Sequence, residues 1–161
     1  MHNLRPATIE DIERIAEIES RCFPEAEAAT LKSFNERFAV FPECFFVLEV
    51  NGKIVGHING CINGSPELPD ELYENASLHQ PDGKFQTVFG LAVDPEFQHQ
   101  GYASRLTEHL VGISKTRGQE GMILTCKEYL VGFYEQYGFK CQGQSASTHG
   151  GAVWNDMLLK F

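Results

Sequence analysis

The sequence lacks the features of a membrane protein or a secreted protein. No apolar run approaches the roughly 18 residues that a membrane-spanning helix requires, and the opening residues MHNLRPATIE lack the basic-then-apolar order of a secretory signal. Basic residues are also few, because 13 Lys and Arg stand against 22 Asp and Glu, for a net charge of −9. Binding to nucleic-acid phosphates needs a clustered basic surface. We therefore expect a cytoplasmic protein with neither a nucleic acid nor a membrane as its partner.

The cysteines form neither a disulfide framework nor a metal-binding pattern. They are five in number and widely spaced, with no CxxC pair and no histidine at metal-ligand spacing. We therefore expect buried free thiols and no metal site. No His or Asp spacing supports a triad around Cys126, so a covalent enzyme intermediate on this thiol is not expected.

The length and the order of the apolar patterns indicate one mixed domain. A chain of 161 residues with 42% hydrophobic and 22% charged residues is most simply a single domain covering 1–161. Predicted strands precede and follow single predicted helices, which is typical of the mixed α/β class. We expect a central sheet that is not wholly parallel.

The first part of the chain favours two helices. Thr8, with Asp11 three positions later, makes a capping-box-like start, and apolar residues recur at helical spacing as far as about Arg21. One stripe of this helix holds Ile9, Ile12, Ala16 and Glu19. A second helix is predicted over 26–38, ending before Pro42, because its apolar residues recur at the same spacing.

A hairpin follows, and after it a long polar connection. The runs CFFVLEV and KIVGHINGCI flank Asn51-Gly52, a pair that satisfies the positive φ values of a type I′ turn. Residues 63–84 are rich in Pro, Asn, Asp and Gly around a short helical segment at 70–74. A connection of this length inside a compact domain is more often a lid or a binding loop than an idle linker.

The remaining elements alternate between strands and helices. Gly138 follows the last predicted helix, in keeping with the left-handed residue that often closes a helix. The predicted strands outside the hairpin lie at 2–5, 85–93, 122–126, 139–142 and 152–161, and the predicted helices in this half lie at 101–117 and 129–137.

The turn between the strand at 85–93 and the helix at 101–117 has the composition of an anion site. It reads DPEFQHQGYASR over 94–105. A helix N-terminus leaves its first N–H groups unpaired and carries a partial positive charge, so such a turn suits a phosphate. No Gly-Lys-Ser/Thr follows, which excludes a Walker loop, and only Gly101 of a GxGxxG triplet is present. The pattern that remains is Gln98-x-x-Gly101-x-Ala103.

This pattern resembles the pyrophosphate loop of the GNAT superfamily of acetyl-CoA-dependent N-acyltransferases. The block MILTCKEYLVGFYEQYGFK resembles the family's next strand and its aromatic helix with a Tyr-Gly-Phe ending, and the likeness spans essentially the whole chain. The resemblance implies a GNAT-type α/β fold, with a mixed central sheet of about seven strands splayed between strands 4 and 5 and about four flanking helices.

Part of the same block resembles the serotonin (arylalkylamine) N-acetyltransferase branch of that superfamily. Thr87 and Phe89, however, stand where that branch carries two histidines proposed to relay the proton of the amine. The sequence also has Gln98 where the family loop often begins with Arg, and Ala103 where it ends in Gly. The first of these departures concerns the route of the proton.

The resemblance implies a binding site for acetyl-CoA as cosubstrate. The backbone N–H groups of about 99–104 would hold the pyrophosphate, and the strand at 91–93 would pair with the pantetheine amides as if the cofactor were an added strand. The cofactor-binding residues expected on this basis are Leu91, Ala92, Val93, Gln98, His99, Gln100, Gly101, Tyr102, Ala103, Ser104, Phe133 and Tyr137. Two catalytic roles are also implied. The backbone N–H near Leu91 would polarise the thioester carbonyl, and the Tyr134 phenol would protonate the leaving thiolate.

The resemblance implies a GNAT-family N-acetyltransferase that transfers an acetyl group from acetyl-CoA to a primary amine of a small molecule. An arylalkylamine or a polyamine would attack the thioester directly in a ternary complex. The alternatives are an acyl-CoA-binding regulatory module without turnover, a protein or peptide N-acetyltransferase, and a different nucleotide-binding α/β domain. The general base stays open between His57, His79, Glu128 and, through water, Thr87. A homodimer is compatible with the sequence.

Overall fold

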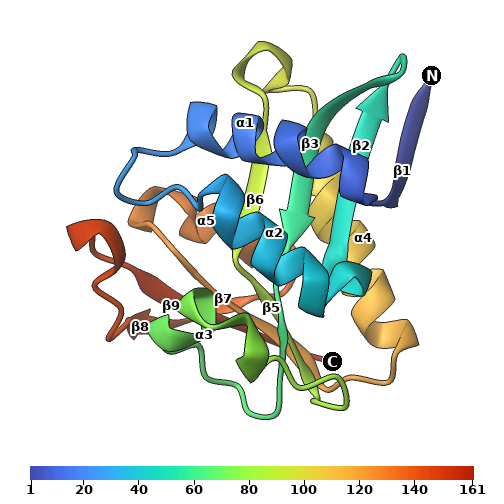
Figure 1. The fold of residues 1–161 in the computed structure, drawn as a ribbon. Helices are drawn as coiled ribbons and strands as arrows, with labels where there is room; N and C mark the ends of the chain where they lie inside the picture. Colours follow the sequence, from blue (N-terminus) through green and yellow to red (C-terminus); the bar gives the residue numbers. More distant parts are fainter. The chain divides into compact units, whose positions relative to one another are not determined.

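The computed structural model describes residues 1–161 as a mixed α/β protein with nine strands in two sheets and five α-helices (Figure 1). The predicted mixed class is thereby confirmed. The chain divides into two compact units, each assembled from two segments. The first unit comprises Met1–Gly60 with Gly90–Leu110, and the second comprises Cys61–Phe89 with Val111–Phe161. That the whole chain behaves as one domain stays a prediction.

The first unit is built on a four-stranded antiparallel sheet. Its strands, in spatial order, are β1 (His2–Pro6), β2 (Phe45–Val50), β3 (Lys53–Asn59) and β6 (Gly90–Val93). The turn between β2 and β3 has φ values of 52° at Asn51 and 82° at Gly52, so the predicted hairpin is confirmed. β6 is the last strand in this order and pairs with β3 along one of its edges.

Two helices belong to the first unit in full. α1 (Ile12–Cys22) continues from a 3-10 turn at Ile9–Asp11, behind the predicted capping box of Thr8 and Asp11. Its buried stripe of isoleucines packs on the sheet, where α1 contacts β3 and β6 (Figure 1). The second helix, α2 (Leu31–Val40), begins five residues later than the 26 that periodicity suggested. Its start is fixed by Thr30, whose hydroxyl accepts a hydrogen bond from the Ser33 N–H at 3.1 Å.

The second unit is built on a five-stranded mixed sheet. Its strands, in spatial order, are β4 (Ile62–Asn63), β5 (Phe85–Val88), β7 (Gly121–Cys126), β9 (Asn155–Lys160) and β8 (Lys140–Gln144). β5 and β7 are parallel, and the other pairs are antiparallel. β8 forms one edge, is exposed along its whole length, and carries a bulge between Cys141 and Gly143.

Three further helices complete the chain. α3 (Asp70–Glu74) lies in the long polar connection, where a short helix was predicted. α4 (Tyr102–Thr116) follows β6, and α5 (Val131–Glu135) follows a 3-10 turn that starts at Glu128. The predicted closing residue Gly138 has a φ of 96°, as a left-handed helix end requires. No helix has both the length and the apolar character needed to cross a membrane.

The single strand predicted at 85–93 is divided between the two sheets. Phe85–Val88 pairs with Gly121–Leu124 in the second unit, and Gly90–Val93 pairs with Gly56–Asn59 in the first. The break falls at Phe89. The parallel ladder of β5 and β7 ends at Val88 and Leu124, directly before the chain changes sheet. The predicted splay stays a prediction.

Candidate functional site

The turn from β6 to α4 is closed by its own polar side chains. Asp94 accepts a hydrogen bond from the Glu96 N–H at 3.0 Å, which caps the 3-10 turn Pro95–Phe97. The Gln98 amide donates from Nε2 to the Val93 carbonyl at 3.0 Å. Gln98 thus braces the loop against the end of the strand.

Beyond Gln98 the backbone turns its N–H groups outward. His99 has a φ of 64° and Gly101 a φ of 82°, and α4 starts at the next residue. The N–H groups of His99, Gln100, Gly101, Tyr102 and Ala103 donate to no acceptor in the protein. Left-handed residues beside a helix N-terminus form a concave cluster of amide hydrogens that suits an anion. This geometry fits the diphosphate of acetyl-CoA.

The backbone angle at position 101 requires glycine, whereas the space around it does not. A Cβ placed on Gly101 would meet no atom within 4 Å, so the surroundings leave room for a side chain. A φ of 82° is strained for any residue with a Cβ. A side chain at this position would project into the open space beside the loop amides.

Below the loop, a buried carboxylate joins β6 to α1. Asp94 is fully buried and is held by Arg14 Nη2 at 2.7 Å and by Arg21 Nη1 at 2.8 Å. Burial alone would raise the pKa of this carboxyl, but the Glu96 N–H, the Arg14 hydrogen bond and the charges of both arginines outweigh it and hold the pKa below its ordinary value. The start of the loop is therefore fixed to the helix on which both arginines lie.

β6 contributes three further residues of the predicted site. Ala92 and Val93 are buried, and Leu91 is partly exposed. On the neighbouring strand β3, Ile58 stands opposite Leu91, His57 opposite Ala92, and Gly56 opposite Val93. Because β6 ends the four-stranded sheet, its second edge has no strand partner within that sheet. An edge of this kind can pair with the amides of an extended ligand.

The remaining predicted residues lie on and beside α5 in the second unit. The Tyr134 ring is buried between Phe133, at 5.1 Å, and Phe139, at 5.7 Å between centroids, and Phe133 also contacts Tyr137 at 5.4 Å. The Tyr134 hydroxyl makes no hydrogen bond to the protein. Burial raises the pKa of Tyr134 above its usual range, which keeps the phenol protonated.

The buried thiol of Cys126 is poorly suited to act as a nucleophile. Burial raises its pKa to about 12, so the thiolate is scarce at neutral pH. This supports the expectation that no covalent intermediate forms on it. No group of three or more His, Cys, Asp or Glu side chains is placed to hold a metal ion.

Three of the four candidate bases have structural partners. Thr87 Oγ1 donates to the Cys61 carbonyl at 2.9 Å, His79 Nδ1 accepts from the Ile62 N–H at 3.0 Å, and Glu128 Oε2 accepts from Asn155 Nδ2 at 3.1 Å. His57 differs from them. It is fully buried, and neither ring nitrogen has a hydrogen-bond partner.

Sequence reasoning missed the residues that surround His57. Glu19 of α1 lies with its Oε1 3.4 Å from His57 Nε2, and Asn59 of β3 is buried beside it. The signal was present in the sequence, because Glu19 falls on the apolar stripe of α1, where a carboxylate is costly unless it has a partner or a task.

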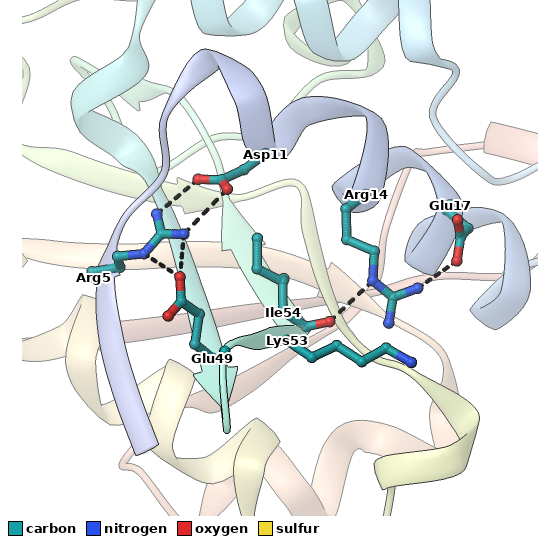
Figure 2. Close-up of a pocket in the computed structure, with 8 residues that line it drawn as sticks. Arg5, Asp11, Arg14, Glu17, Glu49, Lys53 and Ile54 are labelled. Atoms are coloured by element: carbon teal, nitrogen blue, oxygen red, sulfur yellow. Dashed lines mark hydrogen bonds and ion pairs between the residues drawn. The ribbon is translucent and has the colours of Figure 1, made fainter. Parts of the chain in front are cut away.

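A surface pocket of about 430 Å³ in the first unit involves none of the predicted site residues (Figure 2). Figure 2 shows Arg5 held between Asp11 and Glu49, and Arg14 bonded to Glu17 and to the Ile54 carbonyl. The hydrogen bond from Arg5 lowers the pKa of Asp11. Because its arginines are already paired with carboxylates, this pocket has little charge left for a phosphate.

Comparison with known proteins agrees with the arrangement of these elements. The sequence pattern of the Acetyltransferase (GNAT) family matches residues 12–139. The serotonin N-acetyltransferase of Mesocricetus auratus is 27% identical to this chain over 157 residues, which cover 95% of this chain and 74% of that protein.

Two solved structures share the fold. The GphF GNAT-like decarboxylase in complex with isobutyryl-CoA superposes with a TM-score of 0.84 at 22% identity, covering 98% of both chains. The ribosomal-protein-S18-alanine N-acetyltransferase from Escherichia coli gives a TM-score of 0.74 at 23% identity, covering 99% of this chain and 94% of that one. The GNAT-type fold predicted from the sequence is confirmed.

Proposed function

The chain belongs to the GNAT acetyltransferase family, and from this membership we propose that it acetylates a primary amine of a small molecule in a ternary complex. Acetyl-CoA is the cosubstrate and supplies the activated acetyl thioester. The single observation that carries the proposal is the row of unpaired amides at His99–Ala103. This row is where the family signature, the helix N-terminus and the left-handed Gly101 coincide.

The chain's own groups divide the work between binding and chemistry. In the proposal, the loop amides and Ser104 hold the diphosphate, and the second edge of β6 at Leu91–Val93, which has no strand partner within its sheet, pairs with the pantetheine amides. The Leu91 N–H donates to the thioester carbonyl oxygen, where negative charge develops as the amine attacks. Tyr134, which burial keeps protonated, gives its proton to the departing sulfur.

The small-molecule acceptor is supported by the serotonin N-acetyltransferase relative. A protein or peptide N-terminus is the second candidate acceptor, because the fold is shared with the ribosomal-protein-S18-alanine enzyme. Measurement of thiol release from acetyl-CoA with tryptamine, 2-phenylethylamine, spermidine and an alanine-terminal peptide separates these acceptors. Tight CoA binding without thiol release from any of them would favour a regulatory module.

The loop assignment is tested by Gly101→Glu. The new carboxylate would project beside the loop amides and repel the diphosphate, so we expect calorimetric binding of CoA to fall by at least about 10²-fold, or roughly 2.7 kcal/mol. Gly118→Glu is the matched control, because Gly118 follows α4 with a φ of 73° and equally open surroundings. Equal CoA affinity in the two variants would show that the diphosphate binds elsewhere.

A further inference from the structure

Three polar side chains are enclosed beneath α1 in the first unit. His57 and Asn59 are fully buried, and Glu19 is 4% exposed. Because side chains alternate along a strand, His57 and Asn59 share one face of β3, together with Ala92 and Gly90, which stand opposite them on β6. α1 contacts both strands and brings Glu19 to this face.

Most of the polar side-chain atoms of this cluster lack hydrogen-bond partners. Glu19 Oε2 accepts from the Ala29 N–H at 3.1 Å, and the Phe34 ring packs edge-on against His57 at 5.7 Å. Five buried atoms remain without a hydrogen bond, namely Glu19 Oε1, both ring nitrogens of His57, and both amide atoms of Asn59. Buried polar atoms are almost always satisfied, so such a concentration points to a functional role for these side chains.

Gly90 has no side chain to crowd these atoms. A Cβ at this position would lie 3.2 Å from Glu19 Oε1, 3.5 Å from Asn59 Nδ2 and 3.6 Å from His57 Cε1. The φ of Gly90 is not in the left-handed region, so its backbone does not require glycine. A side chain at Gly90, one residue before Leu91, would occupy the room beside the Glu19 carboxylate.

We propose that Glu19, His57 and Asn59 form the subsite that binds the primary ammonium group of the acceptor and takes its proton. This inference rests on the proposed function. A single carboxylate oxygen without a hydrogen bond suits one cationic donor, and an imidazole 3.4 Å away can share the proton that the carboxylate receives. Asn59 borders the same space with its side-chain amide.

The proton balance of the transfer is complete with these groups. The ammonium gives one proton to the Glu19–His57 pair, and the neutral nitrogen then attacks the thioester carbonyl as the C–N bond forms and the C–S bond breaks. The nitrogen loses a second proton, which balances the one that the leaving sulfur takes up. The pair returns its proton to solvent. No oxidant, reductant or metal is needed.

A ligand-based test uses ethylammonium chloride as the probe and the ring signals of His57 in an NMR spectrum as the readout. These signals are assigned by their loss in His57→Gln. We expect ethylammonium to shift them in the wild-type protein and in Glu17→Gln, a control that removes an exposed carboxylate of the same helix. It should not shift them in Glu19→Gln, which keeps an oxygen for the Ala29 N–H. Tetramethylammonium chloride, which has no N–H, controls for ionic strength.

The kinetic arm uses the amine of the thiol-release panel that turns over fastest. Glu19→Gln should lower kcat/KM for this amine by about 10²-fold or more, the usual contribution of a general base, with CoA affinity unchanged. Gly90→Ala should raise the KM for the amine and abolish the ethylammonium shift.

Either of two outcomes would overturn the inference: no shift of the His57 signals in the wild-type protein, or the same shift in Glu19→Gln. Either result would mean that the cluster has only a structural role. A wild-type protein that binds no CoA would instead refute the proposed function, and the ethylammonium result would still decide whether the cluster binds a primary ammonium.

Discussion

At the scale of single residues, burial keeps the Tyr134 phenol in its protonated form. A phenol in water has a pKa of about 10, and the enclosure of Tyr134 among Phe133 and Phe139 raises it further. The group is therefore protonated over the whole neutral range. Because its hydroxyl is not bonded to the protein, it is free to donate to a ligand atom.

Replacement of Tyr134 by Phe removes this proton and little else. We expect kcat for thiol release to fall by about 10²-fold, while CoA affinity by calorimetry stays at the wild-type value. Tyr129→Phe is the matched control, since Tyr129 is 78% exposed on the neighbouring 3-10 turn. Wild-type kcat in Tyr134→Phe would remove this residue from the mechanism.

At the scale of elements, the Asp94 carboxylate fixes β6 and its loop to α1. Asp94→Asn leaves Arg14 and Arg21 without their shared charge partner. A hydrogen bond to a charged group contributes about 1.5–3 kcal/mol. We therefore expect the free energy of unfolding, measured in urea at pH 7, to fall by about 1.5–3 kcal/mol. Asp82→Asn, in the exposed part of the long connection, should change it little.

The pH dependence of this loss has a definite sign. The folded pKa of Asp94 is below its unfolded value of about 3.9. Its contribution is therefore complete above about pH 4 and is lost as the pH falls through the folded pKa. The gap between wild type and Asp94→Asn should close in strong acid, and a gap that widened there would contradict the assignment of the charged form.

The elements that the sequence predicted well are those that local chemistry determines. Asn51-Gly52 and the Thr8–Asp11 box specify their turns without help from the rest of the chain. The break at Phe89 was not predicted, because an apolar strand pattern does not say with which neighbour each half will pair. The Glu19–His57–Asn59 cluster was missed for the same reason, since Glu19 lies about 40 residues before the other two and meets them only through helix packing on the sheet.

At the scale of the whole molecule, each compact unit is assembled from two segments that are separated in the sequence. The chain passes from one unit to the other after Gly60, Phe89 and Leu110. Neither unit can be completed from one continuous piece of chain. This topology favours folding as one cooperative system, in line with the predicted single domain.

Cooperative unfolding can be measured with one reporter in each unit. Trp154, the single tryptophan, reports on the second unit by fluorescence, and the His57 ring signals report on the first. We expect the two urea midpoints to coincide. Midpoints that differ would show two independently folding units and would contradict the single-domain prediction.

The exposed edge strand β8 has a consequence for the behaviour of the protein at high concentration. The unpaired N–H and C=O groups of an edge strand form a template for pairing with a strand of another chain. The bulge between Cys141 and Gly143 interrupts that template, and Gly143, with a φ of 101°, bends the strand out of a straight path. The bulged edge strand β8 therefore disfavours the strand-to-strand pairing that leads to fibrous aggregation.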